Sequence, residues 1–287
     1  MRHRWARPVG RSLMTGCLVL AGTAVAAAPA AGVPGLTRTV AASADDSTAS
    51  KEALAQCPSG TRVLGGGGYI DGGSGYVHLT RLQALGSSDR FAAAAAEHGS
   101  YGGDWRVVAY AICGREPAGL VYASFHTGTD SSGFKAATAS CPGRTQLVST
   151  GARTTGGGGQ VVIDDLLPSA SLTWQQTTAY EDADGYAGDW SLWAFAVCAD
   201  PLPGLELRTA TGQLPPTQDF VTVEVVCPPG KQLHGLGGSI SGGVGKLIYR
   251  WLYPPGPGLD RTAIQVADLE PEHTTGWFAR AYAICAA

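Results

Sequence analysis

The chain repeats one pattern of residues three times. Each copy opens with Cys-Pro, passes through a stretch that is glycine-rich in the first and third copies, and closes on Trp, Ala-aromatic-Ala, one aliphatic residue and Cys. The opening and closing cysteines are Cys57 and Cys113, Cys141 and Cys198, and Cys227 and Cys285. A Pro and a Gly-Leu pair stand at a nearly constant distance before each opening Cys, so the full period is 84 to 85 residues. Such a period is typical of an architecture in which each copy forms one structural unit.

The repeat also indicates how the chain is divided. We expect a signal peptide over residues 1–30, followed by β repeats over 31–116, 117–202 and 203–287. The first residues are basic, an apolar stretch follows from Leu13 to Ala28, and small residues allow cleavage after Ala26 or Ala30. This stretch is too short for a membrane-spanning helix, and no later one is long enough. The sequence therefore predicts a secreted, extracellular protein without a membrane span.

Cleavage of the signal peptide changes the charge of the chain. It removes four Arg and no acidic residue, which leaves 16 basic and 23 acidic residues and a formal charge of −7. A chain this acidic is a poor partner for nucleic acid or an anionic membrane. The sequence does not indicate an oligomeric state.

Six cysteines remain after cleavage, an even number that favours disulfide bonds in an exported chain. Six cysteines allow fifteen pairings, and the repeat favours the one in which each copy joins its own opening and closing Cys. Each bond would close a loop of about 57 residues, for which the chain-entropy estimate gives about 4 kcal/mol. No Cys-x-x-Cys spacing is present, so we predict no metal site, and no motif calls for a cofactor.

The hydrophobic pattern within a copy is that of β-strands. The closing strand is apolar on both faces, which predicts a central strand buried on both sides. We expect the segment from Ala41 to Ala55 to differ from its counterparts by being frayed or locally helical. The glycine runs lack the following helix that a phosphate loop needs, so we interpret them as close strand packing.

About six strands per copy give an all-β fold of three tandem, disulfide-bonded repeats of about 84 residues each. Two arrangements satisfy this pattern. In one, the copies form a pseudo-threefold, prism-like body around a shared core. In the other, three small β-sandwiches follow one another along the chain. The short links between copies favour close packing and the first arrangement.

The sequence contains no complete catalytic motif. Gly-x-Ser-x-Gly and His-Glu-x-x-His are both absent, and the histidines do not recur between copies. His98 and His273 come closest to a shared position, since each precedes a closing Trp. Acidic residues recur there as Glu97, Glu181 and Glu270, and the cluster around Glu181 is an incomplete calcium loop that we interpret as a solvated turn.

Aromatic side chains near acids are the remaining candidates for binding. Tyr101 and Tyr186 lie in glycine-rich loops before the closing Trp, and Trp174 and Trp251 stand in strands with polar neighbours. Rings of this kind stack on sugars, while carboxylates accept hydrogen bonds from sugar hydroxyls. We therefore predict binding residues at Tyr101, Trp174, Glu181, Tyr186 and Trp251, and no catalytic residue.

The pattern Cys-Pro-x-Gly, Gly-Gly-Gly, Trp and Tyr-Ala-Ile-Cys resembles a repeat of uncharacterised secreted proteins of the actinobacterial type. The resemblance covers the chain after the signal peptide, but it rests on structural residues. It implies the extracellular compartment and the fold class, and it transfers no activity and no site.

Three functions fit these observations. The first is a secreted, non-catalytic binding or envelope-associated protein that recognises an extracellular glycan or cell-wall polymer, because repetition multiplies a binding surface. The second is an extracellular hydrolase whose single active site holds non-recurring polar residues such as His98 or Glu181. The third is a secreted protease inhibitor, which would present one protruding rigid loop.

Overall fold

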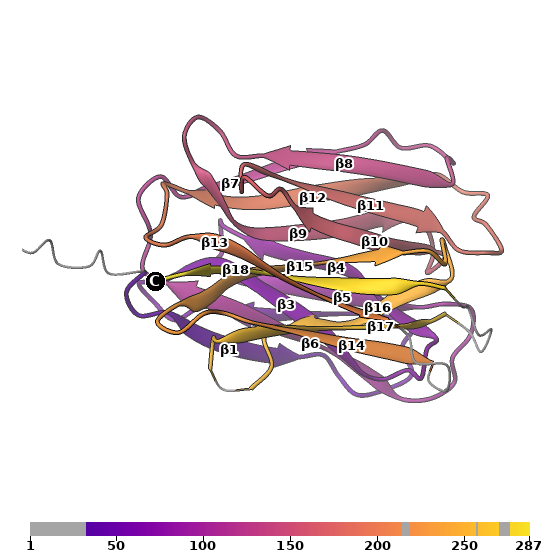
Figure 1. The fold of residues 1–287 in the computed structure, drawn as a ribbon. Helices are drawn as coiled ribbons and strands as arrows, with labels where there is room; N and C mark the ends of the chain where they lie inside the picture. The colour runs from indigo at the N-terminus through magenta and orange to yellow at the C-terminus, as the bar shows by residue number, and fades with distance from the viewer. Residues whose placement is uncertain (1–32, 214–218, 257, 270–275) are drawn as a thin grey trace, which may run out of the picture. The chain divides into compact units, whose positions relative to one another are not determined.

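The computed structural model describes residues 33–213, 219–256, 258–269 and 276–287 (Figure 1). The expected signal peptide, Glu270 and His273 lie outside these residues. The described ranges contain eighteen β-strands and no helix, which confirms the all-β prediction. No helix there is long and apolar enough to cross a membrane.

Each copy contributes six strands in the same order. The first copy holds β1 (Thr37–Ala42), β2 (Ser50–Gln56), β3 (Arg62–Gly72), β4 (Val77–Leu85), β5 (Arg90–Glu97) and β6 (Trp105–Gly114). The second holds β7 (Val121–His126), β8 (Phe134–Ser140), β9 (Gln146–Gly156), β10 (Val161–Pro168), β11 (Trp174–Glu181) and β12 (Trp190–Ala199). The third holds β13 (Glu206–Gln213), β14 (Phe220–Val226), β15 (Gln232–Ser241), β16 (Leu247–Tyr253), β17 (Arg261–Asp268) and β18 (Phe278–Ala286).

Every copy is a small sandwich of two three-stranded layers. In the first copy the layers are β1-β6-β3 and β2-β5-β4, and the other copies repeat this order. The second strand of each copy shows why the layers face one another, since its residues alternate strictly between buried and exposed positions. One face of each layer is therefore turned to the core and the other to solvent.

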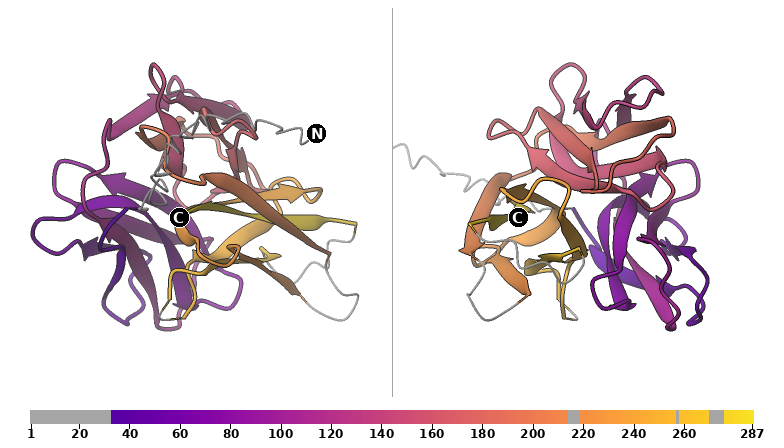
Figure 2. Two further views of the ribbon diagram at one scale, coloured as in Figure 1. Left: turned by 60° about the vertical axis from the view of Figure 1, so that its left-hand side comes forward. Right: turned by 90° about the vertical axis from the view of Figure 1, so that its right-hand side faces the viewer.

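The layers of different copies join into three six-stranded sheets. Sheet A is β1-β6-β3-β16-β17-β14, sheet B is β2-β5-β4-β9-β12-β7, and sheet C is β13-β18-β15-β10-β11-β8. Each sheet thus combines half of one copy with half of another. Sheet A joins the first and third copies, sheet B the first and second, and sheet C the second and third. The two predicted arrangements are both present, because the copies are sandwiches that share their sheets. The right-hand view of Figure 2 shows each copy adjoining the other two.

The glycine-rich strands lie where the copies meet. β3, β9 and β15 each carry one bulged residue, and Gly65, Ser149 and Gly235 follow these bulges. A Cβ atom on Gly65 would lie 2.3 Å from the carbonyl oxygen of His234, and one on Gly235 would lie 2.2 Å from that of Val148. Both distances are shorter than any van der Waals contact, so these glycines permit strands of different copies to approach, as predicted.

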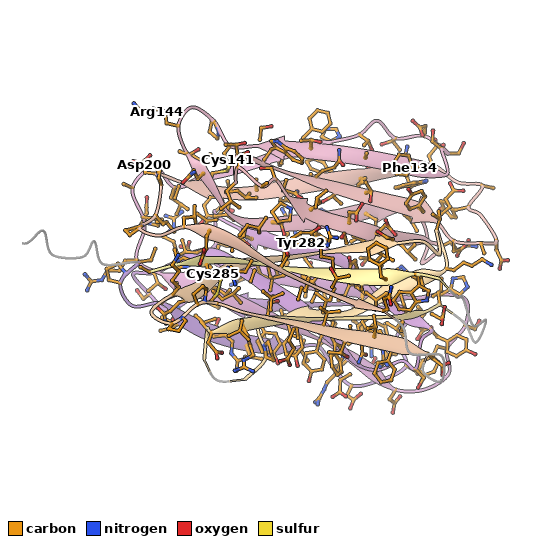
Figure 3. All side chains as sticks on the ribbon, in the orientation of Figure 1. Phe134, Cys141, Arg144, Asp200, Tyr282 and Cys285 are labelled. Atoms are coloured by element: carbon orange, nitrogen blue, oxygen red, sulfur yellow. A yellow bond between two sulfur atoms is a disulfide. The ribbon has the colours of Figure 1, made fainter. Side chains whose placement is uncertain are left out.

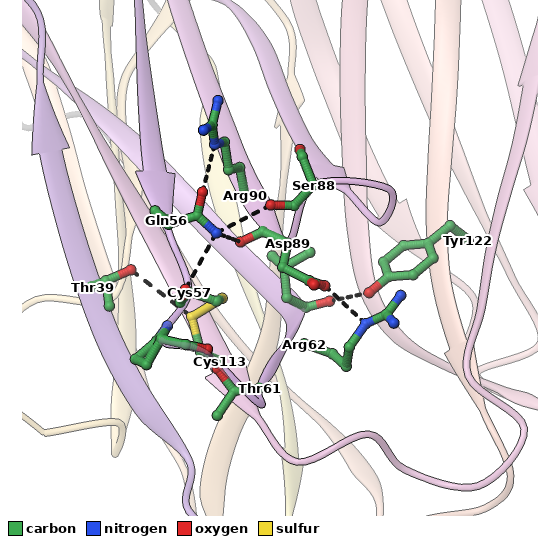
Figure 4. Close-up of a disulfide and its surroundings, with 12 residues drawn as sticks. Thr39, Gln56, Cys57, Thr61, Arg62, Ser88, Asp89, Arg90, Cys113 and Tyr122 are labelled. Carbon is green, nitrogen blue, oxygen red and sulfur yellow. Dashed lines mark hydrogen bonds and ion pairs between the residues drawn. A yellow bond between two sulfur atoms is a disulfide. The ribbon is translucent and has the colours of Figure 1, made fainter.

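Three disulfide bonds connect the layers. The pairs are Cys57–Cys113, Cys141–Cys198 and Cys227–Cys285, as the repeat predicts. Figure 3 labels Cys141 and Cys285, and Figure 4 shows the first bond in detail. Each opening Cys directly follows the second strand of its copy, and its partner lies on the sixth strand in the opposite layer. The bonds therefore lock each sandwich across its core.

One expectation about the strands is wrong, and another holds only in part. The stretch from Ala41 to Ala55 is neither frayed nor helical, because it supplies the end of β1 and most of β2. The closing strand β6 is buried along one face, but along the other face Val108 and Ile112 are buried while Arg106 and Tyr110 are half-exposed, so the expected burial on both faces holds only in part.

We predict that Gly65→Ala destabilises the protein by about 1 to 3 kcal/mol, the usual cost of overpacking a core. The added methyl group would collide with the main chain of another copy, which cannot move aside as a side chain can. Chemical unfolding followed by tryptophan fluorescence would measure the change. Gly102→Ala is the control, because no heavy atom lies within 4 Å of a Cβ atom there. Equal stability of the two variants would contradict the close approach.

Candidate functional site

Two of the recurring acids accept a hydrogen bond from the closing Trp of their own copy. Glu97 accepts a hydrogen bond from the indole nitrogen of buried Trp105 at 2.8 Å, and its other oxygen accepts one from the main-chain nitrogen of Tyr101 at 3.3 Å. In the second copy, Glu181 accepts bonds from Trp190 and from the main-chain nitrogen of Tyr186, each at 3.0 Å. The structure therefore brings Glu181 and Tyr186 together as part of the Trp environment.

A lysine covers each of these two rings from the other side. The Lys51 nitrogen lies 4.4 Å from the centre of the Trp105 ring, and the Lys135 nitrogen lies 4.9 Å from that of Trp190. Lys51 also forms a 2.8 Å ion pair with Asp46. A cation over an indole face is favourable. Since the whole arrangement recurs, we assign it to the fold, and binding by Tyr101, Glu181 and Tyr186 stays a prediction.

The outer faces of the sheets are where the copies differ. At the centre of each sheet, a strand of one copy pairs with a strand of another over two residue pairs. We call these places junction A (β3 and β16), junction B (β4 and β9) and junction C (β10 and β15). The outward pair at each junction occupies the same position in all three sheets. These pairs are Trp251 with Tyr69 in A, Arg81 with Arg153 in B, and Asp165 with Ser239 in C.

Junction A carries a cluster of four aromatic rings. Tyr253 lies between Tyr69 and Tyr110, with ring centres 5.2 Å from each, and Trp251 meets Tyr253 edge-on at 6.1 Å. All four side chains are half-exposed on the outer face of sheet A. Mutual contact fixes their orientation, so this aromatic cluster is a preformed surface. Burial of the rings beside one another raises the pKa of Tyr110 and of Tyr253.

Polar groups surround the aromatic cluster. Arg38 lies over the Tyr110 ring at 5.0 Å and donates a hydrogen bond to the carbonyl oxygen of Pro254 at 2.8 Å. Asp71 pairs with Arg106 beyond Tyr69. On the opposite side, the Gln265 side chain donates to Thr222 at 3.2 Å. Rings bordered by donors and acceptors are the usual composition of a sugar-binding surface.

Of the five residues predicted to bind, Trp251 alone belongs to this cluster. Trp174 lies on β11 in sheet C, where it pairs with Ser140 and is 37% exposed. Tyr69, Tyr110 and Tyr253 were not among the residues predicted from the sequence. Strand alternation places Tyr110 on the second face of the closing strand, but the pairing of β3 with β16, which adds Trp251 and Tyr253, has no local signal.

Junction C carries carboxyl and hydroxyl groups where junction A carries aromatic rings. Asp165 accepts a hydrogen bond from Thr178 at 2.8 Å, and Ser239 lies 3.2 Å from the hydroxyl oxygen of Tyr282, which Figure 3 labels. The preceding bulge residue, Asp164, is buried. Burial, aided by the charge of Asp165, raises the pKa of Asp164 to about 8. This junction therefore carries two adjacent carboxyl groups, one of them protonated at neutral pH.

A third feature lies where the ends of the three copies meet. His98 from the first copy and Asp182 from the second form an ion pair of 2.9 Å, and both side chains are buried. Burial raises the pKa of Asp182, although His98 and main-chain N–H groups oppose this shift. The pair borders a cavity of about 70 Å³ that Lys246 and Leu269 from the third copy help to line. Asp182 thus departs from the solvated turn that the sequence suggests.

His78 lies near this pair and is fully buried. Its Nε2 atom lies 3.2 Å from the carbonyl oxygen of Val161, the distance of a donated hydrogen bond. Burial lowers the pKa of His78 to about 4, and the nearby His98 acts in the same direction. Within the described ranges, no group of three or more His, Cys, Asp or Glu side chains could hold a metal ion.

Comparison with known proteins adds no further assignment. No protein-family model matches this chain, and no curated protein is significantly similar to it.

We predict that Asp164→Asn makes the protein more stable at alkaline pH. Because the folded-state pKa of Asp164 lies above the unfolded value, the folded state holds a proton that the unfolded chain releases. The proton bound to Asp164 therefore stabilises the folded state fully below about pH 4, and this contribution is lost as the pH rises through about 8. At pH 8 the variant should be more stable than the wild type by about 5 kcal/mol, since the folded and unfolded pKa values differ by about four units and one pKa unit corresponds to about 1.4 kcal/mol.

Unfolding in denaturant at a series of pH values would measure this gain. Asp104→Asn is the control, because it removes an exposed carboxylate of the first copy. If wild type and Asp164→Asn lose stability in parallel from acidic to alkaline pH, the carboxyl group of Asp164 is ionised in the folded protein and the prediction is wrong.

Proposed function

We propose that this chain is a secreted, non-catalytic protein that binds an extracellular glycan or cell-wall polymer through the aromatic cluster of junction A. The single observation that carries the proposal is the set of four half-exposed rings, Tyr69, Tyr110, Trp251 and Tyr253, on the open face of sheet A. Sugar rings stack on such faces through their C–H groups, and the polar border offers partners for their hydroxyls.

Comparison between junctions supports a role in binding. At the positions of Tyr69 and Trp251, sheet B has Arg153 and Arg81, and sheet C has Ser239 and Asp165. The fold therefore accepts residues of very different chemistry there, and aromatic rings are not needed to complete a sheet. Rings held by one another lose little conformational freedom when a ligand binds, which favours affinity.

Three features support the extracellular location. The disulfide bonds are of the kind that persists in oxidising compartments. The basic and apolar start of the sequence is typical of a signal peptide. The resemblance to secreted actinobacterial-type repeats agrees with both.

The alternative function, an extracellular hydrolase, draws support from the buried His98–Asp182 pair, because a His oriented by a carboxylate is part of many catalytic sites. Such a site also needs a nucleophile within reach of the His. Among the described residues that line the cavity, none carries a hydroxyl or thiol group. The pair joins two copies, and we favour that structural role.

We predict that the purified protein binds to a glycan array or to isolated cell walls, and that Trp251→Ala weakens this binding about tenfold. A tenfold loss of affinity corresponds to about 1.4 kcal/mol of binding free energy. This is the order expected for loss of one aromatic contact, about 0.5–1.5 kcal/mol, and of the apolar area that it buries. Phe134→Ala is the control, since it removes an exposed aromatic ring from another sheet. Melting temperatures would show that both variants fold. Failure of the wild-type protein to bind either target would refute the proposal.

A further inference from the structure

Junction B brings two arginines together in the middle of sheet B. Arg81 on β4 and Arg153 on β9 are direct cross-strand partners on the outer face, although they belong to different copies. Both side chains are half-exposed. Like charges at directly opposed positions destabilise a sheet. The pair is therefore unfavourable for the protein alone, and it calls for an explanation outside the packing of the strands.

The surroundings compensate for one of the two charges only. Arg81 forms an ion pair with Glu52, and its Nε atom donates a hydrogen bond to Gln83 at 2.8 Å. Arg153 has no such partner among the described residues. Burial lowers the pKa of Arg81, Glu52 opposes this shift, and the charge of Arg153 adds to it. The guanidinium of Arg153, with five N–H donors, thus faces outward beside the charge of Arg81 and has no carboxylate partner among the described residues.

An aromatic row continues from the arginines across the same face. Trp193 on β12 is the cross-strand partner of Arg153, and His126 on β7 is the partner of Trp193 on its other side. The rings of Trp193 and Phe195 are nearly parallel, at 5.9 Å and 8°, and His126 stacks on Trp193 at 4.2 Å. Stacked aromatic residues therefore extend the charged site to the edge of sheet B.

A shallow pocket lies next to both features. It has a volume of about 210 Å³, and Gln83, Ser124 and Phe195 are among the residues that line it. Gln83 is the hydrogen-bond partner of Arg81, and Phe195 stacks on Trp193, so the pocket adjoins the arginines and the aromatic row. Cations, a stacking surface and a hollow of the size of a sugar ring thus occur side by side on one outer face.

We propose that junction B binds an anionic saccharide, with a carboxylate or phosphate group held between Arg81 and Arg153 and a sugar ring stacked on Trp193 or Phe195. A guanidinium matches the geometry of these anions with two parallel hydrogen bonds, which a lysine cannot provide. The bound anion would also neutralise the repulsion between the two arginines. This second site is independent of the aromatic cluster in junction A, because it lies on another sheet and selects by charge.

Other anionic partners fit less well. Nucleic acid needs a stripe of cations along its backbone, whereas the chain without residues 1–30 carries a formal charge of −7. A net negative protein gains nothing from long-range attraction, so binding here depends on short, directed contacts. Such contacts suit a polymer that carries isolated charges between neutral rings.

The test is calorimetric titration of the full-length protein with three probes. These probes are a short oligogalacturonate, its methyl ester as the uncharged form, and a glycerol phosphate oligomer. We expect the protein to bind at least one acidic probe and to bind the methyl ester at least tenfold more weakly. The two acidic probes distinguish a carboxylate source from a phosphate source.

Variants locate the site. Arg153→Gln should weaken acidic-probe binding about tenfold, as expected for loss of a charge-assisted hydrogen bond, and Arg153→Lys should give an intermediate loss. Thermal stability of Arg153→Gln should be unchanged or higher, because the repulsion with Arg81 is removed. Arg144→Gln is the matched control, since it removes an exposed arginine from a loop of the same copy.

The outcomes separate this site from the one in junction A. Trp251→Ala should leave acidic-probe binding intact, and Arg153→Gln should leave binding of neutral glycans intact. The inference is overturned if the wild-type protein binds neither acidic probe, or if Arg153→Gln binds them as well as wild type. Equal binding of the oligogalacturonate and its methyl ester would also overturn it.

Discussion

The close approach of strands from different copies is the constraint on which the rest of the structure depends. Each junction contains two residue pairs, and the inward residue on its shorter strand is a fully buried leucine: Leu82, Leu166 and Leu252. A buried leucine contributes about 2 kcal/mol by removal of apolar area from water. The glycines beside these pairs allow main chains to meet. Without them, the half-sheets of each copy would end in unpaired edges.

This constraint divides the residues of each copy into two groups. Those facing inward repeat, because the same core must be built three times: Cys, Gly, Leu and Trp in every copy, and in the first two copies also the carboxylate that accepts the indole hydrogen. Residues facing outward at the junctions do not repeat, since solvent accepts any side chain there. Trp251, Arg81 and Asp165 stand at one equivalent position and share no chemistry. The geometry of the three faces is thus conserved within the chain while their surfaces have diverged.

The sequence predicts the first group well and the second poorly, for a physical reason. Alternation of burial along a strand and the spacing of Cys are local signals, so the strands and all three disulfide bonds are predictable. Pairing across a junction joins residues such as Tyr69 and Trp251, which are far apart in the chain and carry no mark of their partnership. Trp251 could be recognised as a candidate, but its three neighbouring rings could not. The role of Glu181 was also hidden, because a carboxylate that accepts a bond from a buried Trp looks in sequence like one that awaits a ligand.

Divergence at the junctions has a further consequence for affinity. Faces that each bind one feature of a polymer act together only if a single chain reaches more than one of them, and then each contact raises the effective concentration of the next. Sheets A and B both contain half of the first copy, so that copy supplies Tyr69 and Tyr110 to the aromatic cluster and Arg81 to the arginine pair, within one framework of two layers and a disulfide bond. The two sites lie on the opposite outer faces of that copy's sandwich, so a polymer with neutral and acidic segments would have to pass around its edge to meet both. The first copy, placed between two different junctions, is therefore the part of the chain on which selectivity for such a polymer would depend.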